Sequence, residues 1–170
     1  FREDIDNGYD YKDKIVELTQ DIDLKKSSTK LNSFKSMVNE LGEIDFGRFN
    51  GIFDGNGYTI SNYNDPRSGL FSITGPNSII RNVNIDADVT IEDDLQCINL
   101  KIESHDHSSK FTKRTEYGLI ANENSGTISR CSTLGNIVTK SQKVDIGGIV
   151  GSNDTFKYFK KNDKFKGYIY

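Results

Sequence analysis

Apolar residues alternate with polar ones over short segments throughout the chain. Phe49, Gly51 and Phe53 share one face of an extended segment, and Val89 and Ile91 share a face of another. The same period of two occurs at Val16 and Leu18, at Ile22 and Leu24, and at Ile98, Leu100 and Ile102. Because side chains alternate between the two faces of a β-strand, this pattern predicts a series of short strands, each with one buried face.

A short pattern recurs in which an Ile is followed, three residues later, by a second residue expected to point inward. It occurs as Ile60-Ser61-Asn62-Tyr63, Ile80-Arg81-Asn82-Val83 and Ile128-Ser129-Arg130-Cys131. The segments start 20 and 48 residues apart, and 48 is about two periods of 24, within the roughly 20 to 50 residues typical of repeat arrays. The spacing predicts successive coils, with Asn62 and Asn82 at equivalent corners. Asn tolerates left-handed backbone angles, and stacked Asn side chains are expected to form a hydrogen-bonded ladder.

A second series runs in step with the first and combines Gly with a short apolar run. Its members are Ser68-Gly69-Leu70-Phe71, Tyr117-Gly118-Leu119-Ile120 and Gly147-Gly148-Ile149-Val150-Gly151. Small residues beside a strand suit a tight corner, where Gly adopts backbone angles closed to other residues. Each coil is therefore expected to hold several short strands joined by Gly or Asn corners.

Residues 34–41 are the only helical candidate. Phe34, Met37, Val38 and Leu41 have helical spacing, Ser33 is placed as an N-cap, and Gly42 follows the expected end. A βαβ fold would need such helices between all its strands. We therefore interpret this segment as a short capping helix that covers the open end of the core near the N-terminus.

The composition favours a narrow β core in a single domain of residues 1–170. Hydrophobic residues make up 34% of the chain and Gly numbers 15, which leaves too few apolar side chains for several long amphipathic helices. Within this domain we expect N-terminal strands and a cap over 1–48, repeated coils over 49–153 with a polar excursion at about 86–116, and a C-terminal aromatic and basic segment over 154–170.

Charge and hydropathy exclude two classes of partner. The formal net charge of −3 provides no long-range attraction to nucleic acid. No stretch reaches the roughly 18 apolar residues that would span a bilayer, so no membrane insertion by this chain is expected. Cys97 and Cys131 lack CxxC spacing; buried free thiols and a bond between neighbouring strands both remain open.

The residues Phe49 to Asn62, FNGIFDGNGYTISN, resemble the FxGxFDGNGxTIxN signature of bacterial GLUG-motif surface proteins. Further segments are similar to recurring elements of the same family: Gly69 to Phe71, Ile80 to Val83, Gly126 to Cys131 and Gly147 to Gly151, with lead-in segments at Asp6 to Gly8 and Leu18 to Leu24. The resemblance spans most of residues 4–153. It departs from the family upstream of residue 49, where a Trp-Pro-Ile-Gly stretch is usual and this chain has no Trp.

The resemblance implies an all-β fold, a right-handed parallel β-helix like that of pectate lyases. Proteins of this family occur as adhesins, as surface proteins and in the stalks of secreted proteases, and most are not enzymes in this region. The resemblance thus implies an extracellular or cell-surface location, within a longer surface protein.

The densest acidic cluster consists of Asp86, Asp88, Glu92, Asp93 and Asp94. Calcium takes several carboxylate and carbonyl oxygens, but the EF-hand and RTX patterns are absent from the sequence. A solvated loop is the favoured interpretation, with a Ca²⁺ site as the alternative. Two carboxylates at suitable separation would also serve glycoside hydrolysis.

Other chemistry-bearing segments give weaker signals. His105, Asp106 and His107 would place two imidazoles on one side of a strand, fewer ligands than a zinc site needs. The Asp54-Gly55 and Asn56-Gly57 dipeptides indicate turns, and no P-loop spacing surrounds them. No residue is assigned as catalytic, cofactor-binding or metal-binding.

The C-terminal segment alternates aromatic and basic residues, among them Phe156, Tyr158 and Phe159. It suits a cap that seals the last coil, the start of a further coil, or a surface that stacks on sugars. The leading hypothesis is a non-catalytic extracellular module, adhesin-like, that binds a glycan or a host or environmental protein. A polysaccharide lyase or glycoside hydrolase and a passive stalk are the alternatives.

Overall fold

The computed structural model describes residues 1, 4–5, 8–25, 37–38, 44–45, 48–66, 68–91, 115–140, 144–153 and 168–169. In these ranges the protein is all-β. Its strands are β1 (Ile15–Glu17), β2 (Ile22–Asp23), β3 (Met37–Val38), β4 (Ile44–Asp45), β5 (Arg48–Phe49), β6 (Ile52–Asp54), β7 (Thr59–Tyr63), β8 (Phe71–Thr74), β9 (Ile79–Arg81), β10 (Asn84–Ile91), β11 (Thr115–Gly118), β12 (Ala121–Asn124), β13 (Thr127–Ser129), β14 (Ser132–Thr139), β15 (Val144–Gly147), β16 (Val150–Ser152) and β17 (Tyr168–Ile169).

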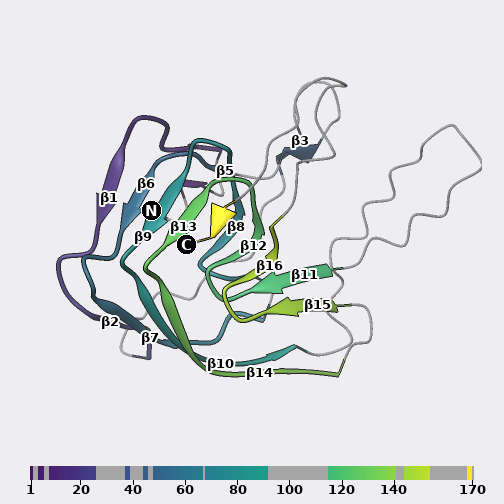
Figure 1. Ribbon diagram of the computed structural model, residues 1–170. Coiled ribbons are helices and arrows are strands. Elements are labelled where there is room, and N and C mark those ends of the chain that lie inside the picture. The colour runs from purple at the N-terminus through teal and green to yellow at the C-terminus, as the bar shows by residue number, and fades with distance from the viewer. Residues whose placement is uncertain are drawn as a thin grey trace, which may run out of the picture.

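Three parallel sheets contain most of these strands (Figure 1). Sheet 1 has the order β1-β6-β9-β13-β17, sheet 2 the order β2-β7-β10-β14, and sheet 3 the order β5-β8-β12-β16. Each pass of the chain adds one strand to sheet 1, then one to sheet 2, then one to sheet 3. A further parallel pair, β11 and β15, comes between sheets 2 and 3 along the chain, and β3 pairs with β4 in antiparallel fashion.

The register stacks the inward residues of successive passes on one another. In sheet 1, Phe53 is the partner of Ile80, and Ile80 is the partner of Ile128. In sheet 2, Ile60 is the partner of Ile85. All five side chains are buried and belong to one hydrophobic core. Each such side chain contributes about 1.5–3 kcal/mol on burial, so the rows of Ile and Phe hold the sheets together.

The predicted alternation is confirmed where the structure describes it. In β10, Val89 and Ile91 are buried, whereas Asp86 and Asp88 are exposed. The Gly-containing series also stacks as expected, since the backbone N–H of Leu70 donates to the carbonyl of Leu119. Residues 98–102 lie outside the described residues.

The repeat pattern predicts that Ile60, Ile80 and Ile128 occupy equivalent positions in successive coils, and for Ile60 this prediction is wrong. Ile60 lies in sheet 2, whereas Ile80 and Ile128 lie in sheet 1. In sheet 1, the residue of the preceding pass that pairs with Ile80 is Phe53. The Ile-x-x-apolar pattern occurs in both sheets because an inward residue on each side of a corner produces the same spacing.

The expected capping helix is not seen. Within 34–41 the structure describes residues 37–38, and these form β3, paired with β4. Helices shorter than about 12 residues have little stability of their own. Apolar spacing over eight residues therefore could not specify a helix where a strand partner was near in sequence.

The expected subdivisions of the chain lie only partly within the described residues. Residues 86–91, placed at the start of the polar excursion, are the last six residues of the eight-residue strand β10. Residues 92–114 of that excursion lie outside the described residues, as do 154–167, and residues 115–116 begin β11. Tyr168 and Ile169 form β17, which pairs with β13 at the edge of sheet 1. The division into one domain of residues 1–170 stays a prediction.

In the part of the chain that the structure describes, no helix has the length and apolar character needed to cross a membrane.

Candidate functional site

The outward side of β10 and β14 carries an unusual mixture of side chains. The register pairs Asp86 with Leu134, Asp88 with Asn136, and Thr90 with Val138. All six side chains are exposed, since their strand neighbours Ile85, Ala87, Val89 and Ile91 occupy the core side. We call these six residues the outer face.

Two aliphatic side chains stand out on this face. Leu134 is 72% exposed and Val138 is 54% exposed. They are four residues apart on one strand, so they point to the same side with Asn136 between them. Scattered apolar residues are common on protein surfaces, but a row of two beside carboxylates provides both apolar contact and hydrogen-bonding groups.

Hydrogen bonds fix the polar groups of the outer face. The Asp88 carboxylate accepts from the backbone N–H of Asn136 at 3.1 Å and from its side-chain amide at 3.0 Å. At the start of the strands, the Ser132 hydroxyl and the Asn84 amide oxygen are 2.6 Å apart. The Asn84 amide nitrogen in turn donates to the carbonyl of Gly57 at 2.9 Å. The polar groups of Asp88 and Asn136 on the outer face are therefore positioned before any partner binds.

Gly135 keeps the two strands of this face in close contact. Its φ is +112°, and a Cβ built there would overlap the backbone carbonyl of Ala87 on β10. Only Gly meets both conditions. Leu134 and Asn136, on either side, are thereby held at fixed positions.

The corner between sheets 1 and 2 is built around the buried carboxylate of Asp54. Asn82 donates its side-chain amide at 3.0 Å, the backbone N–H of Asn56 donates at 2.9 Å, and Arg81 Nε donates at 2.6 Å. The hydrogen bond from Asn82, with those from Asn56 and Arg81, holds the pKa of Asp54 below its ordinary value. Asn56 and Gly57 have positive φ, and Tyr58 N–H donates to Gly55, so the predicted turn is confirmed.

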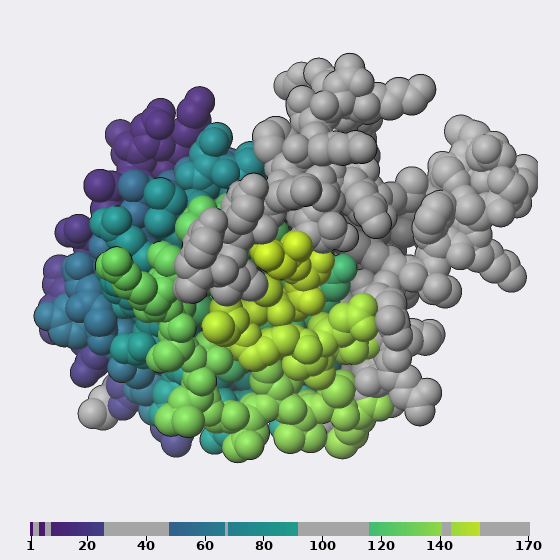
Figure 2. Space-filling view, in the orientation of Figure 1, coloured from purple at the N-terminus to yellow at the C-terminus, as the bar shows by residue number. Residues whose placement is uncertain are grey.

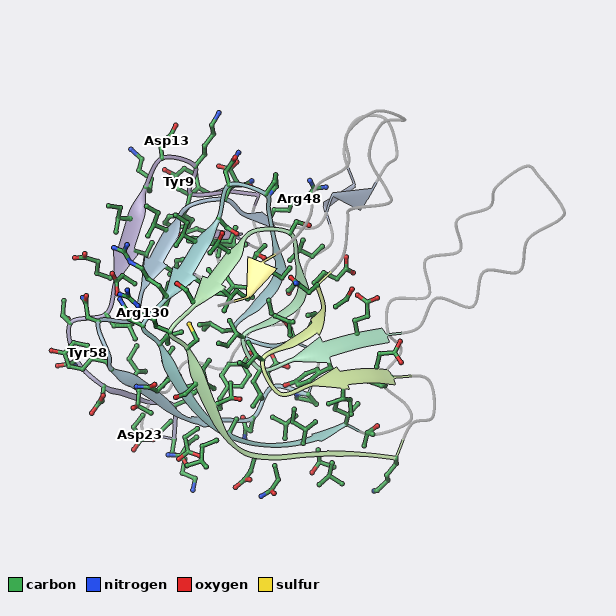
Figure 3. All side chains as sticks on the ribbon, viewed as in Figure 1. Tyr9, Asp13, Asp23, Arg48, Tyr58 and Arg130 are labelled. Atoms are coloured by element: carbon green, nitrogen blue, oxygen red, sulfur yellow. The ribbon has the colours of Figure 1, made fainter. Side chains whose placement is uncertain are left out.

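The Asn ladder lies at a different corner from the predicted one. Asn62 and Asn82 have the left-handed backbone expected of them, but their side chains bind Asp23 and Asp54. The stacked ladder is between sheets 3 and 1, where the Thr74 hydroxyl donates to Asn124 and Asn124 donates to Asn153 at 2.7 Å. In Figure 3, Arg130 marks the corner between sheets 1 and 2, and Asp23 and Tyr58 lie near the start of sheet 2.

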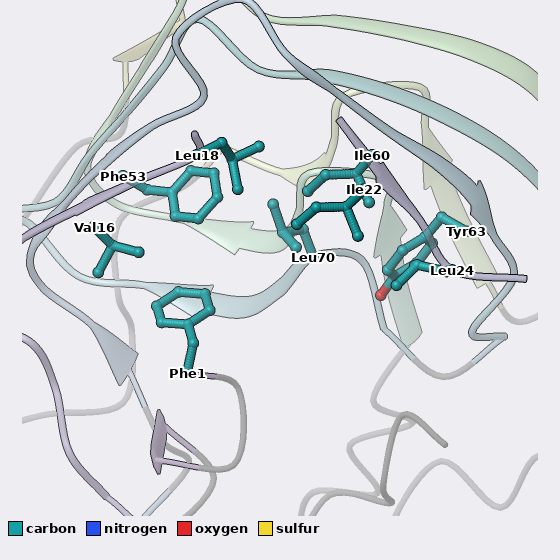
Figure 4. A pocket seen from close by; sticks show the side chains of 9 residues that line it. All are labelled: Phe1, Val16, Leu18, Ile22, Leu24, Phe53, Ile60, Tyr63 and Leu70. Carbon is teal, nitrogen blue, oxygen red and sulfur yellow. The ribbon is translucent and has the colours of Figure 1, made fainter. Parts of the chain in front are cut away.

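A hollow of about 240 Å³ opens beside the first strands of sheets 1 and 2 (Figure 4). It is lined by Phe1, Val16, Leu18, Ile22, Leu24, Phe53, Ile60, Tyr63 and Leu70. The Tyr63 hydroxyl is engaged with the carbonyl of Ser68 at 2.7 Å, so the lining presents carbon atoms. This hollow suits apolar groups and provides no acid, base or nucleophile.

The structure places few of the chemical groups singled out from the sequence. Asp86 and Asp88 lie on the outer face, but Glu92, Asp93 and Asp94 lie outside the described residues. The same holds for His105, Asp106 and His107, and for Phe156, Tyr158 and Phe159. Among the residues that the structure does describe, no three His, Cys, Asp or Glu side chains are grouped so that they could hold a metal ion.

Cys131 has a free thiol and is half-buried. Its sulfur lies 3.2 Å from the carbonyl oxygen of Ser129, and burial raises the pKa of the thiol. This corresponds to the free-thiol alternative for Cys131, while Cys97 lies outside the described residues.

Sequence reasoning missed Leu134, Val138 and the hollow. In residues 132–139, apolar side chains occur on both faces of the strand, at Leu134 and Val138 on one and at Ile137 on the other. Alternation in the sequence therefore could not tell which face is buried. The hollow depends on how the first pass of the chain meets the second, for which no local signal exists.

Comparisons with protein-family models, with curated proteins and with solved structures found no match to this chain.

Proposed function

We propose that the chain is a right-handed parallel β-helix. The support is the repeated order of sheets 1, 2 and 3 on successive passes, with parallel neighbours in each sheet. The resemblance of residues 49–62 to the GLUG signature agrees with this architecture and with an extracellular or cell-surface location. Parallel stacking of this kind produces long, flat outer faces whose side chains are set by the register.

The proposed function is non-catalytic recognition of a glycan or a protein through the outer face, as in an adhesin. Folds do not determine functions, so the proposal rests on the site. The observation that carries it is the exposure of Leu134 and Val138 beside the hydrogen-bonded Asp88 and Asn136. Exposed aliphatic groups lose water-accessible area on binding, and prepositioned amide and carboxylate groups add direction to the contact.

The neighbouring rows extend this polar surface across sheet 2. Asp23 of β2 accepts from the Asn62 amide at 2.8 Å, and Asp21 accepts from the backbone N–H of Thr59 at 2.8 Å. The contact from Asn62 to Asp23 runs from β7 to β2, as that between Asn136 and Asp88 runs from β14 to β10, and Asp21 directly precedes β2. The surface thus presents ordered hydrogen-bonding groups on four neighbouring strands, an arrangement suited to an extended ligand.

The test is incubation of the purified protein on an array of acidic and neutral polysaccharides and of extracellular matrix proteins, with and without Ca²⁺. Retention and the release of shortened products are scored in the same wells. Retention without shortened products is the expected result. Release of shortened products would contradict the proposal and indicate a lyase or hydrolase. The absence of both retention and shortened products from every well would also contradict it and indicate a passive stalk.

A further inference from the structure

The strands of sheet 2 carry charge of one sign. As the structure describes them, β2, β7, β10 and β14 contain Asp23, Asp86 and Asp88 and no Lys, Arg or His. The strands of sheet 1, and likewise those of sheet 3, contain an Arg as well as a carboxylate. Lys140 directly follows β14, at the end of that strand farther from Asp86. Sheet 2 is therefore the acidic one of the three main sheets.

Two carboxylates of the outer face are available to pair with a cation. Asp86 is exposed, and within the described part of the chain no hydrogen bond or ion pair engages its carboxylate. Both hydrogen bonds from Asn136 to Asp88 go to Oδ1, so Oδ2 is not engaged by the described residues. Asp86 and Asp88 are two residues apart on one strand, about 6.6 Å along it, and point the same way.

The apolar row of the outer face lies beside these carboxylates. Leu134 pairs in register with Asp86, and Val138 pairs with Thr90, the next outward residue after Asp88. In Figure 2, β14 lies at the surface, in green along the lower margin of the molecule. Because neighbouring strands are about 4.8 Å apart, a single ligand on this face contacts both aliphatic carbon and carboxylate oxygen.

The chemistry of the outer face favours a polypeptide over a glycan. Sugar rings present C–H groups that pack well on the flat faces of aromatic side chains, and none of the six residues of this face is aromatic. An acidic polysaccharide would also bring like charge toward Asp86 and Asp88, which is unfavourable. A polypeptide that contains Lys or Arg provides the opposite charge, and its apolar side chains match Leu134 and Val138.

We propose that the outer face binds an extended basic segment of a partner protein, whose Lys or Arg side chains pair with Asp86 and Asp88 while apolar side chains cover Leu134 and Val138. This binding mode rests on the proposed recognition function and narrows its ligand to a protein. In an extended polypeptide every second side chain points the same way, at the same spacing of about 6.6 Å that separates Asp86 from Asp88. A segment lying along β10 thus stays in step with the residues of the face.

The test measures retention of the full chain on immobilised synthetic peptides of eight residues, the length of β10. The basic peptide alternates Thr with Lys and Leu, so that Lys and Leu share one face when it is extended. Its two controls replace Lys with Gln or with Glu. We expect retention on the basic peptide, retention about threefold or more weaker on the Gln peptide, and none on the Glu peptide. Retention on the basic peptide should fall as the salt concentration rises from about 0.05 to 0.5 M, because salt screens exposed charges.

Two double variants of equal net charge separate the outer face from the acidity of the whole chain. Asp86→Asn with Asp88→Asn removes the two carboxylates of the face. Asp13→Asn with Glu17→Gln removes two exposed carboxylates at and just before β1, in sheet 1. The first pair should weaken binding of the basic peptide about three- to tenfold, as expected for two exposed ion pairs, and the second should leave it unchanged. Circular dichroism and thermal melting establish that each variant folds.

Equal retention on the basic and Gln peptides, no retention on the basic peptide, or equal losses in the two double variants would overturn this binding mode. The double variant Leu134→Ser and Val138→Ser distinguishes that failure from failure of the proposed function. If it loses retention on a ligand from the polysaccharide and matrix-protein array while Asp86→Asn with Asp88→Asn keeps it, the outer face recognises a ligand of other chemistry, and only the basic segment is excluded. If both double variants bind every retained ligand as the wild-type protein does, the proposed function fails as well.

Discussion

The hydroxyl of Tyr117 donates a hydrogen bond to the backbone carbonyl of Asp65, at 2.7 Å and 52 residues away in the sequence. The donor belongs to β11 and the acceptor to the segment that joins β7 to β8. Tyr63 makes a similar contact with the carbonyl of Ser68. Both tyrosines are 1% exposed, so the segment between sheets 2 and 3 is fastened from the core side.

Replacing Tyr117 with Phe should lower the free energy of unfolding by about 1–3 kcal/mol, because the buried carbonyl of Asp65 loses this donor. Urea denaturation monitored by circular dichroism measures the change. Tyr58→Phe is the control, since Tyr58 is half-exposed and the described structure records no hydrogen bond from its hydroxyl. Equal effects of the two substitutions would contradict this role for Tyr117.

Gly135 and Gly57 provide a matched pair for the close approach between β10 and β14. Both have positive φ, +112° and +81°, but a Cβ at Gly57 meets nothing within 4 Å, whereas one at Gly135 overlaps the backbone of Ala87. Gly57→Ala should cost about 1–2 kcal/mol from backbone strain alone. Gly135→Ala should cost more, by about 1–3 kcal/mol, because backbone atoms must move apart.

Thermal unfolding of the two Gly variants under one set of conditions provides the comparison. A larger loss for Gly57→Ala than for Gly135→Ala would show that Gly135 does not set the spacing of the outer face.

The lowered pKa of Asp54 predicts how stability depends on pH. A carboxyl whose pKa is lower in the folded than in the unfolded state binds fewer protons when folded, so it stabilises the fold above the ordinary pKa of 3.8. That contribution is lost as pH falls below 3.8 toward the lower folded value. Asp54→Asn removes it, so the melting temperatures of wild type and variant should differ most near neutral pH and converge in acid.

Asp4, whose carboxyl also has a lowered pKa, is present in both proteins and cancels from this comparison. A difference in melting temperature that stays constant down to strongly acidic pH would contradict the role assigned to the Asp54 charge.

The strands could be predicted because their side chains alternate. Val89 and Ile91 are buried and Asp86 and Asp88 exposed, as period-two alternation requires. Stacking of the Gly-containing segments also followed from sequence, since their composition repeats at one corner. The sheet that contains Ile60 could not be predicted, because the same local sequence pattern occurs at two corners of one pass.

Long-range polar contacts were beyond the reach of the sequence. The sequence around Asn124 does not distinguish it from the other Asn residues of the chain. Its position between Thr74 and Asn153 results from strand pairing across three passes. The exposure of Leu134 and Val138 could not be predicted for the same reason. Their outward direction is set by the register with Asp86 and Thr90, and no pattern within residues 132–139 indicates it.

The most direct test of the outer face as a recognition surface is a binding titration of the polysaccharide or matrix protein retained on the array. The wild-type protein is compared with the double variant Leu134→Ser and Val138→Ser. The control is Ile15→Ser, which changes an aliphatic side chain that is 60% exposed on sheet 1. The affinity of the double variant should be at least tenfold weaker, which corresponds to about 1.4 kcal/mol, and that of Ile15→Ser should be unchanged. Equal affinity of the folded double variant and the wild-type protein would contradict this role of the outer face.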